Sequence, residues 1–452
     1  MSKTPLAAII LAAGQGTRMK SDLHKVLHPL AGKPMVHHLL DSVSQLNVEK
    51  MVVIVGSRKE QLEASLAPRI AEHKVVLAEQ SEMLGTGHAV AQASGALAGF
   101  EGNILILFGD VPLTSAATMQ IMLERLEAKD KPQTVVLGFR HKDPAAYGRI
   151  IADEDQIIHK MVEFKDANSD ERKVNLCNSG LMAVRSADLF DLLDQIDNDN
   201  AAGEYYLPDI VMLPGPPSAV VIADDEKEVT GVNSRAELAA LEQLWQQNRR
   251  ATAMADGASM IAPDTVWFSH DTKIGRDVVI EPNVVFGAGV EIADKVTIHA
   301  FSHLEGAKVA SGAKVGPYAR LRPGAVMEED SKVGNFVEVK KAVLGKGAKA
   351  NHLSYIGDAN VGAGANIGAG TITCNYDGYF KYQTNIGEGA FVGSNSALVA
   401  PVNIGRGAIV AAGSTVTRDV GDGELRLVRA EQAVKPGWAD RFNDAMRKKK
   451  GG

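Results

Sequence analysis

An apolar residue recurs at every sixth position through most of the C-terminal half of this 452-residue chain. The first run has seven such residues and later runs keep the same rhythm: Phe268, Ile274, Ile280, Phe286, Ile292, Ile298 and Leu304, then residues within 309–339, 344–356, 361–367 and 386–416. A period of six matches neither a helix nor an alternating strand. It is typical of the hexapeptide parallel β-helix, in which three hexads form a triangular coil with the apolar residues inside. We predict a left-handed β-helix of about seven to eight coils, at about 18 residues per coil.

Glycine distribution and length both divide the chain into two domains. Of the 44 glycines, 16 lie in residues 1–250 and 24 in residues 265–430, where the corners of a β-helix need small residues. The chain is also longer than the roughly 100–200 residues of one ordinary domain. Between the halves, Ser234 and Glu237 have the spacing of a capping box and predict a helix. We expect an N-terminal domain at 1–232, a linker helix at 233–257, and a β-helix domain with a C-terminal tail at 258–452.

Composition and charge exclude several classes of protein. With 45% hydrophobic and 23% charged residues, the chain is typical of globular proteins and not of disordered or fibrous ones. A net charge of −7 and the lack of long apolar stretches predict neither a nucleic-acid nor a membrane partner. The basic run 447–450 is interpreted as part of a solvated, disordered tail. Cys177 and Cys374 cannot build a disulfide framework or a CxxC metal site, which suits a reducing cytoplasm.

The N-terminal half alternates between short apolar runs and helix-compatible stretches. Runs that are apolar on both faces indicate parallel strands covered by helices. The candidate strands are residues 6–11, 51–55, 104–108, 135–139 and 181–184, with helices at 35–46 and 87–98. This alternation predicts a doubly wound, Rossmann-like α/β sheet, whose ligands bind at the carboxyl ends of the strands.

Glycines and charged residues follow the first of these strands. Gly14 and Gly16 let backbone N–H groups approach phosphate oxygens, and Arg18 and Lys25 can neutralise a polyphosphate. The segment is neither a GxGxxG fingerprint nor a Walker A loop. A plain turn from strand to helix is the alternative interpretation.

A carboxylate and two more glycine-bearing segments follow other strands. Asp110 comes directly after residues 104–108, where a carboxylate can hold Mg²⁺ beside substrate phosphates or simply cap a turn. Residues 84–87 open a helix whose N–H groups can face a ligand. Gly148 lies shortly after the fourth strand. Four such placements in one sheet favour a phosphate-binding site.

One segment interrupts the hexads of the C-terminal half. Residues 371–385 hold three of the eight tyrosines of the chain, and a polar aromatic insertion in a rigid solenoid favours a functional loop over a tolerated surface excursion. Nearby, His352 stands at a position expected to be a corner. It is a candidate general base, with an ordinary surface histidine as the alternative.

Several of these segments together resemble known enzymes. Residues 11–19, Lys25, and residues 84–88, 109–112, 203–206 and 231–233 resemble the sugar-nucleotide pyrophosphorylase domain. Residues 321–324, 334–341, 352–355, 366–378 and 411–414 closely resemble the bacterial bifunctional N-acetylglucosamine-1-phosphate uridyltransferase and glucosamine-1-phosphate acetyltransferase family. The resemblance covers nearly the whole chain, and the stretch 366–378 is highly specific.

The resemblance implies a function for each domain. The C-terminal domain would acetylate glucosamine 1-phosphate from acetyl-CoA, and the N-terminal domain would then join N-acetylglucosamine 1-phosphate to UTP with release of pyrophosphate. The product, UDP-N-acetylglucosamine, feeds peptidoglycan and lipopolysaccharide synthesis. The family is a cytoplasmic homotrimer with acetyltransferase sites between neighbouring β-helices.

The resemblance also implies roles for individual residues. Asp110 and Asn233 would ligate Mg²⁺, and Arg18 and Lys25 would hold phosphates. The uridyltransferase substrates would be bound by Leu11, Gly14, Gln80, Gly85, Thr86, Gly148, Glu163, Asn178 and Asn233. His352 would be the general base of acetyl transfer, with the sugar phosphate bound by Arg322, Lys340, Tyr355 and Asn366. Acetyl-CoA would contact Ala369, Asn375, Tyr376, Ser394, Ala412 and Arg429.

The sequence departs from the family pattern at three positions and leaves two alternatives. Met83, His24 and Ser179 replace residues that are commoner in the family, and none of them removes a proposed catalytic group. A nucleotidyltransferase with a single activity on another sugar 1-phosphate would lack the 366–378 loop. A non-catalytic interaction protein of the same architecture, like the exchange subunits of a eukaryotic translation initiation factor, would be expected to lose Arg18, Lys25 and Asp110.

Overall fold

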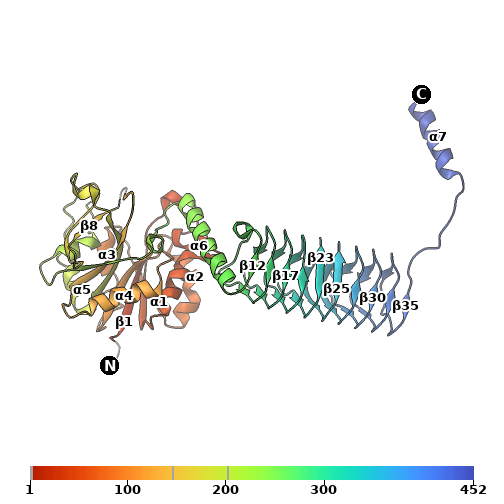
Figure 1. Ribbon diagram of the computed structural model, residues 1–452, viewed down its shortest axis with the longest axis horizontal. Coiled ribbons are helices and arrows are strands. Elements are labelled where there is room, and N and C mark those ends of the chain that lie inside the picture. Colours follow the sequence, from red (N-terminus) through yellow and green to blue (C-terminus); the bar gives the residue numbers. More distant parts are fainter. Residues whose placement is uncertain (1–3, 145–146, 201–202, 452) are drawn as a thin grey trace. The chain divides into compact units, whose positions relative to one another are not determined.

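The computed structural model describes residues 4–144, 147–200 and 203–451 (Figure 1). The chain forms two compact units, the first ending at Trp245 and the second beginning at Gln246. In the described part of the chain, no helix has both the length and the apolar character that a membrane crossing requires. Each unit is described separately.

The first unit is built on a nine-stranded sheet flanked by helices. Seven strands run in the order β11-β7-β10-β6-β1-β4-β5, and β8 and β9 are attached to β10. The strands are β1 (Leu6–Leu11), β4 (Lys50–Val55), β5 (Val75–Glu79), β6 (Asn103–Phe108), β7 (Thr134–Arg140), β8 (Arg149–Ala152), β9 (Ile158–Val162), β10 (Leu176–Arg185) and β11 (Ala219–Ile222). The helices are α1 (Met35–Ser44), α2 (Lys59–Ala71), α3 (Thr86–Ala91), α4 (Ala116–Leu126) and α5 (Ser186–Leu193). The doubly wound α/β fold predicted from the sequence is therefore present.

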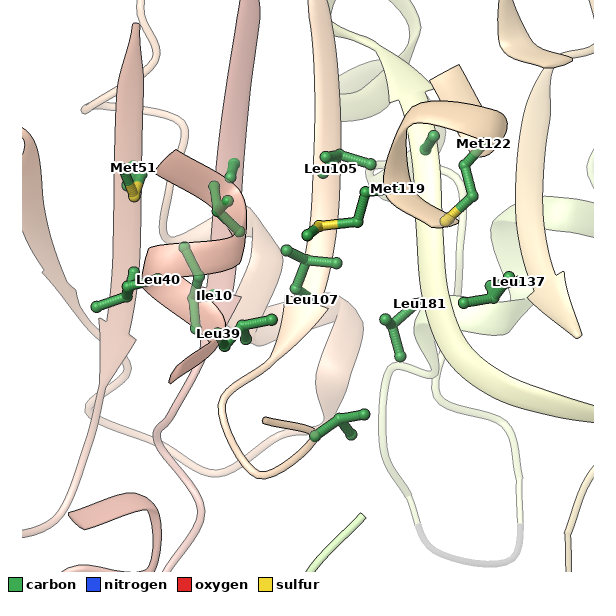
Figure 2. Close-up of a cluster of buried hydrophobic side chains, with 14 of the residues drawn as sticks. Ile10, Leu39, Leu40, Met51, Leu105, Leu107, Met119, Met122, Leu137 and Leu181 are labelled. Carbon is green, nitrogen blue, oxygen red and sulfur yellow. The ribbon is translucent and has the colours of Figure 1, made fainter. Parts of the chain in front are cut away.

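Helices cover both faces of this sheet and form two hydrophobic cores. On one face, α1, α2 and α4 bury side chains such as Leu39, Leu66 and Met119 against the strands. Figure 2 shows part of this core, with Met119 and Met122 of α4 near Leu105 and Leu107 of β6. On the other face, α3 and α5 pack on the alternate residues of the same strands. Both faces of the central strands are buried, as the uninterrupted apolar runs predicted.

The direction of one strand differs from the expectation of a parallel sheet. Strand β10 pairs antiparallel with both β6 and β7, while β1 pairs parallel with β4 and β6. A strand that is buried on both faces has the same apolar composition in either direction, so its sequence does not reveal this reversal.

The predicted linker helix is α6 (Arg235–Ala255). Its start is capped by Ser234, whose Oγ accepts a hydrogen bond from the backbone N–H of Glu237 at 3.2 Å. The Glu237 carboxylate in turn accepts from the backbone N–H of Asn233 at 2.5 Å. In the first unit, Leu241 of α6 packs with Leu30, Met35 and Val232. The boundary between the two units falls inside this helix.

The second unit is a triangular parallel β-helix, seen in Figure 1 as a ladder of short stacked strands. One face holds ten strands: β12 (Ser259–Met260), β14 (Val279–Ile280), β17 (Thr297–Ile298), β20 (Lys314–Val315), β23 (Lys332–Asn335), β25 (Lys349–His352), β27 (Asn366–Ile367), β30 (Phe391–Val392), β33 (Ile409–Val410) and β35 (Leu425–Arg426). The other two faces share fourteen: β13 (Lys273–Ile274), β15 (Val285–Phe286), β16 (Glu291–Ile292), β18 (His303–Leu304), β19 (Lys308–Val309), β21 (Arg320–Leu321), β22 (Val326–Met327), β24 (Glu338–Leu344), β26 (Tyr355–Val361), β28 (Ile372–Cys374), β29 (Thr384–Ile386), β31 (Ala397–Val399), β32 (Val402–Ile404) and β34 (Thr415–Val416). This is the left-handed β-helix that the hexads predicted.

The stack is taller than the estimate of seven to eight coils, since one face has ten strands. The hexad count missed the coils at both ends, such as that of β12, where the repeat is imperfect. The inward apolar residues stack in register from coil to coil, for example Ile280 on Ile298 and Ile298 on Val315, and all three are fully buried. This column of branched side chains is the core of the second unit.

The corners of the β-helix are less dependent on glycine than expected. Phe301, Tyr318, Phe336 and Leu353 all adopt positive φ angles between 53° and 59° and are about half exposed. Ring stacking explains in part why aromatic residues stand at these corners, because the ring centroids of Phe301 and Tyr318 lie 4.9 Å apart and those of Tyr318 and Phe336 lie 5.2 Å apart. We call this column of four residues the corner ladder.

The tail is not disordered throughout, which corrects the interpretation of the basic run 447–450. Residues 427–437 have no regular secondary structure, but helix α7 (Trp438–Lys450) follows them. Gly437 precedes the helix with a φ of 68°, and the last turn contains the basic run. The charge of the run indicates solvation, but Trp438, Phe442 and Met446 before and within the same segment are four residues apart, a spacing that favours a helix.

Candidate active sites

The carboxyl ends of β1 and β6 open into a pocket of about 330 Å³ in the first unit. It is lined by Leu11, Ala12, Ala13, Gly14, Lys25, Val26, Gln80, Met83, Gly85, Thr86, Ala89, Phe108, Asp110 and Glu204. Seven of these were candidate residues from the sequence: Leu11, Gly14, Lys25, Gln80, Gly85, Thr86 and Asp110. Because β1 and β6 are adjacent and parallel, residues that follow them meet at one edge of the sheet. Two other hollows of this unit, of about 690 and 900 Å³, are lined by none of the candidates.

Three candidate residues from distant parts of the chain meet in and beside this pocket. The ammonium group of Lys25 contacts the carboxylate of Asp110 and lies 3.2 Å from the amide oxygen of Asn233. The side chains of Lys25 and Asp110 are 14% and 16% exposed, so solvent screens this ion pair only partly. Backbone pairing brings Asn233 close, because the N–H of Val232 donates to the carbonyl of Asp110 at 2.9 Å. The cluster has no net charge, so the Lys25 ammonium group can bind a phosphate when another cation takes its place beside the Asp110 carboxylate.

Asp110 and Asn233 also have the chemistry of a magnesium site. Mg²⁺ prefers oxygen ligands and usually takes one or two from the protein, completing its shell with water and substrate phosphates. Both oxygens already face one positive charge, the Lys25 ammonium group. Among the described residues, no three His, Cys, Asp or Glu side chains form a metal-binding group. The donor set therefore fits a cation that is shared with a phosphorylated substrate.

Gly85 shapes the far end of this pocket. Its φ of 109° and ψ of 178° belong to a region that is nearly exclusive to glycine, and a Cβ atom there would lie 2.5 Å from the carbonyl oxygen of Tyr205. Hydrogen bonds tie this turn to the 204–207 segment, since Leu207 N–H donates to Thr86 Oγ1 at 3.0 Å. Gln80 is buried and donates to the carbonyl of Gly85 at 3.1 Å. Gln80, Gly85 and Thr86 thus form one rigid wall.

A second pocket of about 550 Å³ shares Thr86, Phe108 and Glu204 with the first. It contains three further candidates from the sequence, Gly148, Glu163 and Asn178. Burial raises the pKa of the Glu163 carboxyl above its usual value, and the charges of Asp166 and Asp209 add to this effect. A Cβ atom on Gly148 would lie 3.2 Å from Glu163 Oε1, so glycine leaves room for this carboxyl. The two pockets together can hold a molecule with a polyphosphate part and a polyhydroxylated part.

Among the candidates of the first unit, Asn233 lines neither pocket but contacts Lys25, whereas the structure does not bring Arg18 into either pocket. Arg18 lies in the short 3-10 helix η1 (Thr17–Met19), and its side chain is exposed. The preceding Gly16 has a clearer structural role. It has a φ of 62°, and a Cβ atom there would lie 2.7 Å from Cβ of Lys25. Gly16 therefore lets the chain of Lys25 pass beneath the loop.

In the second unit, neighbouring coils assemble a cluster of positive charges. Arg322 donates to the carboxylate of Glu338 at 2.8 Å, and Lys340 lies two residues further along β24 on the same side of the strand. The positive charge of Arg322, followed by that of Lys381, lowers the pKa of Lys340 below its usual value. This mutual effect places three cations near one another. Lys381 comes from the loop between β28 and β29 and was missed as a site residue, although the loop was predicted to be functional.

His352 lies on the coil that follows, with an exposed side chain. Its Nδ1 is 2.6 Å from the amide oxygen of Asn335, directly below it in the register of β23 and β25. An amide oxygen can only accept a hydrogen bond, so Nδ1 carries the proton and Nε2 is the basic nitrogen. Tyr355 starts β26 and pairs with Glu338, which brings it next to the cation cluster. Asn335 was not predicted from the sequence, since its relation to His352 depends on the coil register.

Four of the remaining candidates of the second unit, Ala369, Ser394, Ala412 and Arg429, lie along one corner of the prism. Coil by coil, the backbone N–H of Asn395 donates to the carbonyl of Ala369, and that of Gly413 donates to the carbonyl of Ser394. Arg429 donates from Nη1 to the carbonyl of Ala412 at 2.9 Å. Lower on the same corner, Gly370 N–H donates to the carbonyl of His352. Ala369, Ser394 and Ala412 thus stand above His352 in one column.

The predicted functional loop is shorter than the interruption of the hexads. Strand β28 includes the first part of the interruption and strand β29 includes its last part, so the loop between them consists of residues 375–383. Asn375 is buried and donates to the carboxylate of Asp358 at 2.5 Å, while Tyr376 is 60% exposed. Asn366 lies in β27, next to this loop along the chain. The register of the hexads continues across the loop, because Ala359 pairs with Thr384.

Comparisons with known proteins agree with this division. Residues 8–206 match the MobA-like NTP transferase domain family, residues 271–306 match six repeats of the bacterial transferase hexapeptide, and residues 383–418 match the hexapeptide repeat of succinyl-transferase. The bifunctional protein GlmU of Sphingopyxis alaskensis is 66% identical over 448 residues, which is 99% of this chain and 98% of that protein. Those of Novosphingobium aromaticivorans and Paramagnetospirillum magneticum are 66% and 52% identical, covering 99% and 100% of this chain and 98% and 99% of their own length, respectively.

Proposed function

The chain belongs to the family of bifunctional GlmU proteins, and on this premise we propose that it makes UDP-N-acetylglucosamine in two steps. Its β-helix is an acyltransferase domain that acetylates glucosamine 1-phosphate from acetyl-CoA. Its α/β unit is a nucleotidyltransferase that joins N-acetylglucosamine 1-phosphate to UTP and releases pyrophosphate. The observation that carries the proposal is the convergence of Lys25, Asp110 and Asn233 in and beside a pocket that shares residues with a second, carboxylate-bearing pocket.

Uridyl transfer needs charge balance and alignment more than covalent help from the protein. A phosphate oxygen of the sugar phosphate attacks the α-phosphorus of UTP, a new P–O bond forms, and the bond to the pyrophosphate group breaks. The Lys25 ammonium group balances charge on the phosphates, and the wall of Gln80, Gly85 and Thr86 receives the uracil end. The Glu163 carboxylate accepts hydrogen bonds from the hydroxyl groups of the sugar, and the Asn178 amide can donate and accept them. We propose that residues 14–18 fold over the bound triphosphate and that Arg18 then contacts its phosphates.

We propose that Asp110 and Asn233 hold Mg²⁺ during this reaction. When bound, Mg²⁺ neutralises charge on the triphosphate and fixes its orientation. In the absence of the metal, Lys25 contacts both oxygen ligands and keeps them together. A chelator should therefore stop uridyl transfer and leave acetyl transfer unchanged.

Acetyl transfer needs a neutral amine and a base that takes its proton. We propose that Nε2 of His352 accepts a proton from the amino group of glucosamine 1-phosphate, while Asn335 holds the opposite ring nitrogen. The nitrogen then forms a bond to the thioester carbonyl carbon, the carbon–sulfur bond breaks, and the sulfur leaves as the thiol of CoA. Arg322 and Lys340 bind the phosphate, and Tyr355 and Asn366 bind the sugar. Acetyl-CoA lies along Ala369, Asn375, Tyr376, Ser394, Ala412 and Arg429.

We propose that the chain forms a homotrimer through its β-helix. Supporting this, the corner ladder exposes three stacked aromatic rings and a leucine, and this column continues upward to His352 and Ala369. A partner that covers the ladder would also approach His352 and Ala369. We further propose a cytoplasmic location, where acetyl-CoA and UTP are available and where Cys177 and Cys374 stay reduced.

A coupled assay tests the proposal directly. The protein is incubated with glucosamine 1-phosphate, acetyl-CoA, UTP and Mg²⁺, and formation of UDP-N-acetylglucosamine, free thiol and pyrophosphate is followed. Supplying N-acetylglucosamine 1-phosphate instead isolates the second step. Product from the second step alone would support the single-activity nucleotidyltransferase, and no product from folded protein would support the interaction protein. Sedimentation velocity with Phe336→Ser tests the trimer, which this change should dissociate.

A further inference from the structure

Asp358 is a charged residue beside the proposed acetyl site that neither proposed reaction uses. It lies within β26 at a corner of the β-helix, with a φ of 45°, a left-handed conformation that Asp tolerates better than most residues. Its carboxylate accepts a hydrogen bond at 2.5 Å from Nδ2 of Asn375, which lies on the next coil and is assigned to acetyl-CoA in the proposed function. Asp358 is therefore placed to act through Asn375.

The backbone beside Asp358 is fastened to the coil that carries Asn375. Thr373 is buried, and its hydroxyl donates to the carbonyl of Gly357 at 3.0 Å and accepts from the N–H of Gly357 at 2.8 Å. A Cβ atom on Gly357 would collide with the hydroxyl of Tyr355, a proposed sugar contact, so the Tyr355 side chain lies over this glycine. The Asp358 carboxylate is consequently held in place next to residues of the proposed site.

The hydrogen bond to Asp358 determines which way the amide of Asn375 is turned. A carboxylate can only accept hydrogen bonds, so the amide nitrogen, Nδ2, must face it. Oδ1 is then directed away from Asp358, and no described residue donates a hydrogen bond to it. Although Asn375 is only 7% exposed, its Oδ1 is not among the fully buried polar atoms that lack a partner, and so it reaches the surface. Asn375 therefore presents an unused hydrogen-bond acceptor.

The loop between β28 and β29 has hydrogen bonds of its own that do not involve Asp358. The backbone N–H of Tyr382 donates to the carbonyl of Asn375 at 2.9 Å, which closes the loop. Within it, Tyr376 and Lys381 form an antiparallel bridge. Loss of the Asp358 side chain should therefore release the amide of Asn375 and leave Lys381 beside the cation cluster.

We propose that Asp358 is a positioning residue for acetyl transfer, which holds the amide oxygen of Asn375 toward acetyl-CoA. There the oxygen accepts a hydrogen bond from an amide N–H of the pantetheine arm, which has two such groups and no charge. An amide turned the other way would set its own N–H groups against those of the ligand. The inference rests on the proposed function, because the assignment of Asn375 to acetyl-CoA belongs to it.

Initial rates of thiol release by the full chain test the proposal with Asp358→Gly. Glycine adopts a φ of 45° without strain, so this change removes the side chain and keeps the corner. The KM for acetyl-CoA should rise about five- to ten-fold, the effect of losing one hydrogen bond. The kcat should stay unchanged, because a contact that is equal in the bound state and the transition state affects KM alone. The KM for glucosamine 1-phosphate should also stay unchanged, because Lys381 keeps its place.

Three further variants separate positioning from a general loss of structure. Asp277→Gly makes the same replacement at an exposed corner between β13 and β14, where φ is 55°, and should behave as the wild type. Asp358→Asn should keep the wild-type KM, because its amide can turn an oxygen toward Asn375. Asp358→Gly combined with Asn375→Ala should be no worse than Asn375→Ala alone, since one residue acts through the other.

Exchanging the two side chains tests the same hydrogen bond without a glycine. Asn375→Asp alone sets two carboxylates against each other and should raise the KM for acetyl-CoA. Adding Asp358→Asn should restore it, because donor and acceptor have changed places and a carboxylate oxygen now faces the ligand. If Asp358→Gly does not fold, this pair decides the question, and lack of restoration overturns the proposal.

The outcomes distinguish this inference from the proposed function. A wild-type KM for acetyl-CoA in Asp358→Gly, or additive effects of Asp358→Gly and Asn375→Ala, would overturn the inference alone. A rise confined to the KM for glucosamine 1-phosphate would also overturn it, because the loop and not the amide would then depend on Asp358. Wild-type protein that is folded and releases no thiol would refute the proposed acetyl transfer itself, and the role of Asp358 with it.

Discussion

Replacing Gly85 by alanine should damage uridyl transfer alone. The residue has a φ of 109° and a ψ of 178°, a conformation that is nearly restricted to glycine and costs other residues about 1–3 kcal/mol. The added Cβ atom would also lie 2.5 Å from the carbonyl oxygen and 2.8 Å from the backbone nitrogen of Tyr205. Neither atom can move freely, because the Gly87 N–H and the Leu84 carbonyl both hydrogen-bond to Tyr205 at 2.8 Å.

The variant has two ways to respond, and both weaken the binding of UTP. If the turn relaxes in the free protein and UTP binding restores it, the strain of about 2 kcal/mol is incurred only in the bound state, which lowers affinity about 30-fold. If the turn stays relaxed with UTP bound, it loses two hydrogen bonds worth about 1 kcal/mol each and displaces Thr86 from the pocket wall. In either case the KM for UTP rises by an order of magnitude or more, and the acetyl-transfer rate of the same preparation stays unchanged.

Initial rates of pyrophosphate release at varied UTP, with thiol release measured in parallel, provide the assay. Gly95→Ala is the matched control, because Gly95 has no positive φ and a Cβ atom there meets nothing within 4 Å. The reasoning is refuted if Gly85→Ala shows the wild-type KM for UTP together with the wild-type melting temperature.

Three further predictions concern other parts of the molecule. His352→Ala should lower acetyl transfer by about 10²–10⁴-fold and Asn335→Ala by about ten-fold, with uridyl transfer intact in both, as followed by thiol release; equal effects of the two changes would contradict the assignment of the base. Asp110→Ala should abolish Mg²⁺-dependent pyrophosphate release and spare thiol release, and a variant that still releases pyrophosphate at the wild-type rate would exclude Asp110 from the site. Burial, reinforced by nearby cations, lowers the pKa of His24 from 6.5 to about 4, so the unfolded chain binds this proton first as the pH falls. Its contribution to stability, up to about 3 kcal/mol, is present above pH 6.5 and lost between pH 6.5 and about 4, and His24→Asn should flatten that part of the pH dependence in urea unfolding.

Local patterns predicted most of the fold. The hexads place an inward-facing residue at every sixth position. Because three hexads make one coil, they also indicate which inward residues of neighbouring coils stack on each other. The β-helix could therefore be predicted from the sequence. The apolar runs of the first domain specified buried strands in the same way. Strand direction and the number of coils were not predicted correctly, because a fully buried strand has no polar side and the end coils depart from the repeat.

Site residues could be predicted from the sequence where they come directly after a strand or belong to a single motif. Lys25 and Asp110 come together because the ends of the adjacent parallel strands β1 and β6 share an edge. Asn233 joins them because the N–H of Val232 donates to the carbonyl of Asp110. By contrast, the partnership of Asn335 with His352 depends on an offset of 17 residues between two coils, which the hexads do not specify. The role of Arg18 stays a prediction, since the place of a residue in a motif does not by itself determine where its side chain lies.

The coil is also a unit of length in which this protein can grow or shrink. Lys273 pairs with Glu291 eighteen residues later, and each coil contacts only the coils next to it. If the chain gained or lost one complete coil before β21, every inward residue would still face the core of the prism. His352, Asn335 and the cation cluster would not change. A gain or loss of another size inside a strand would turn the inward column outward, whereas a corner can absorb it, as in the 17-residue step from Ile292 to Val309. Homologous β-helices should therefore differ in height by whole turns, while insertions of arbitrary size collect at corners such as residues 375–383.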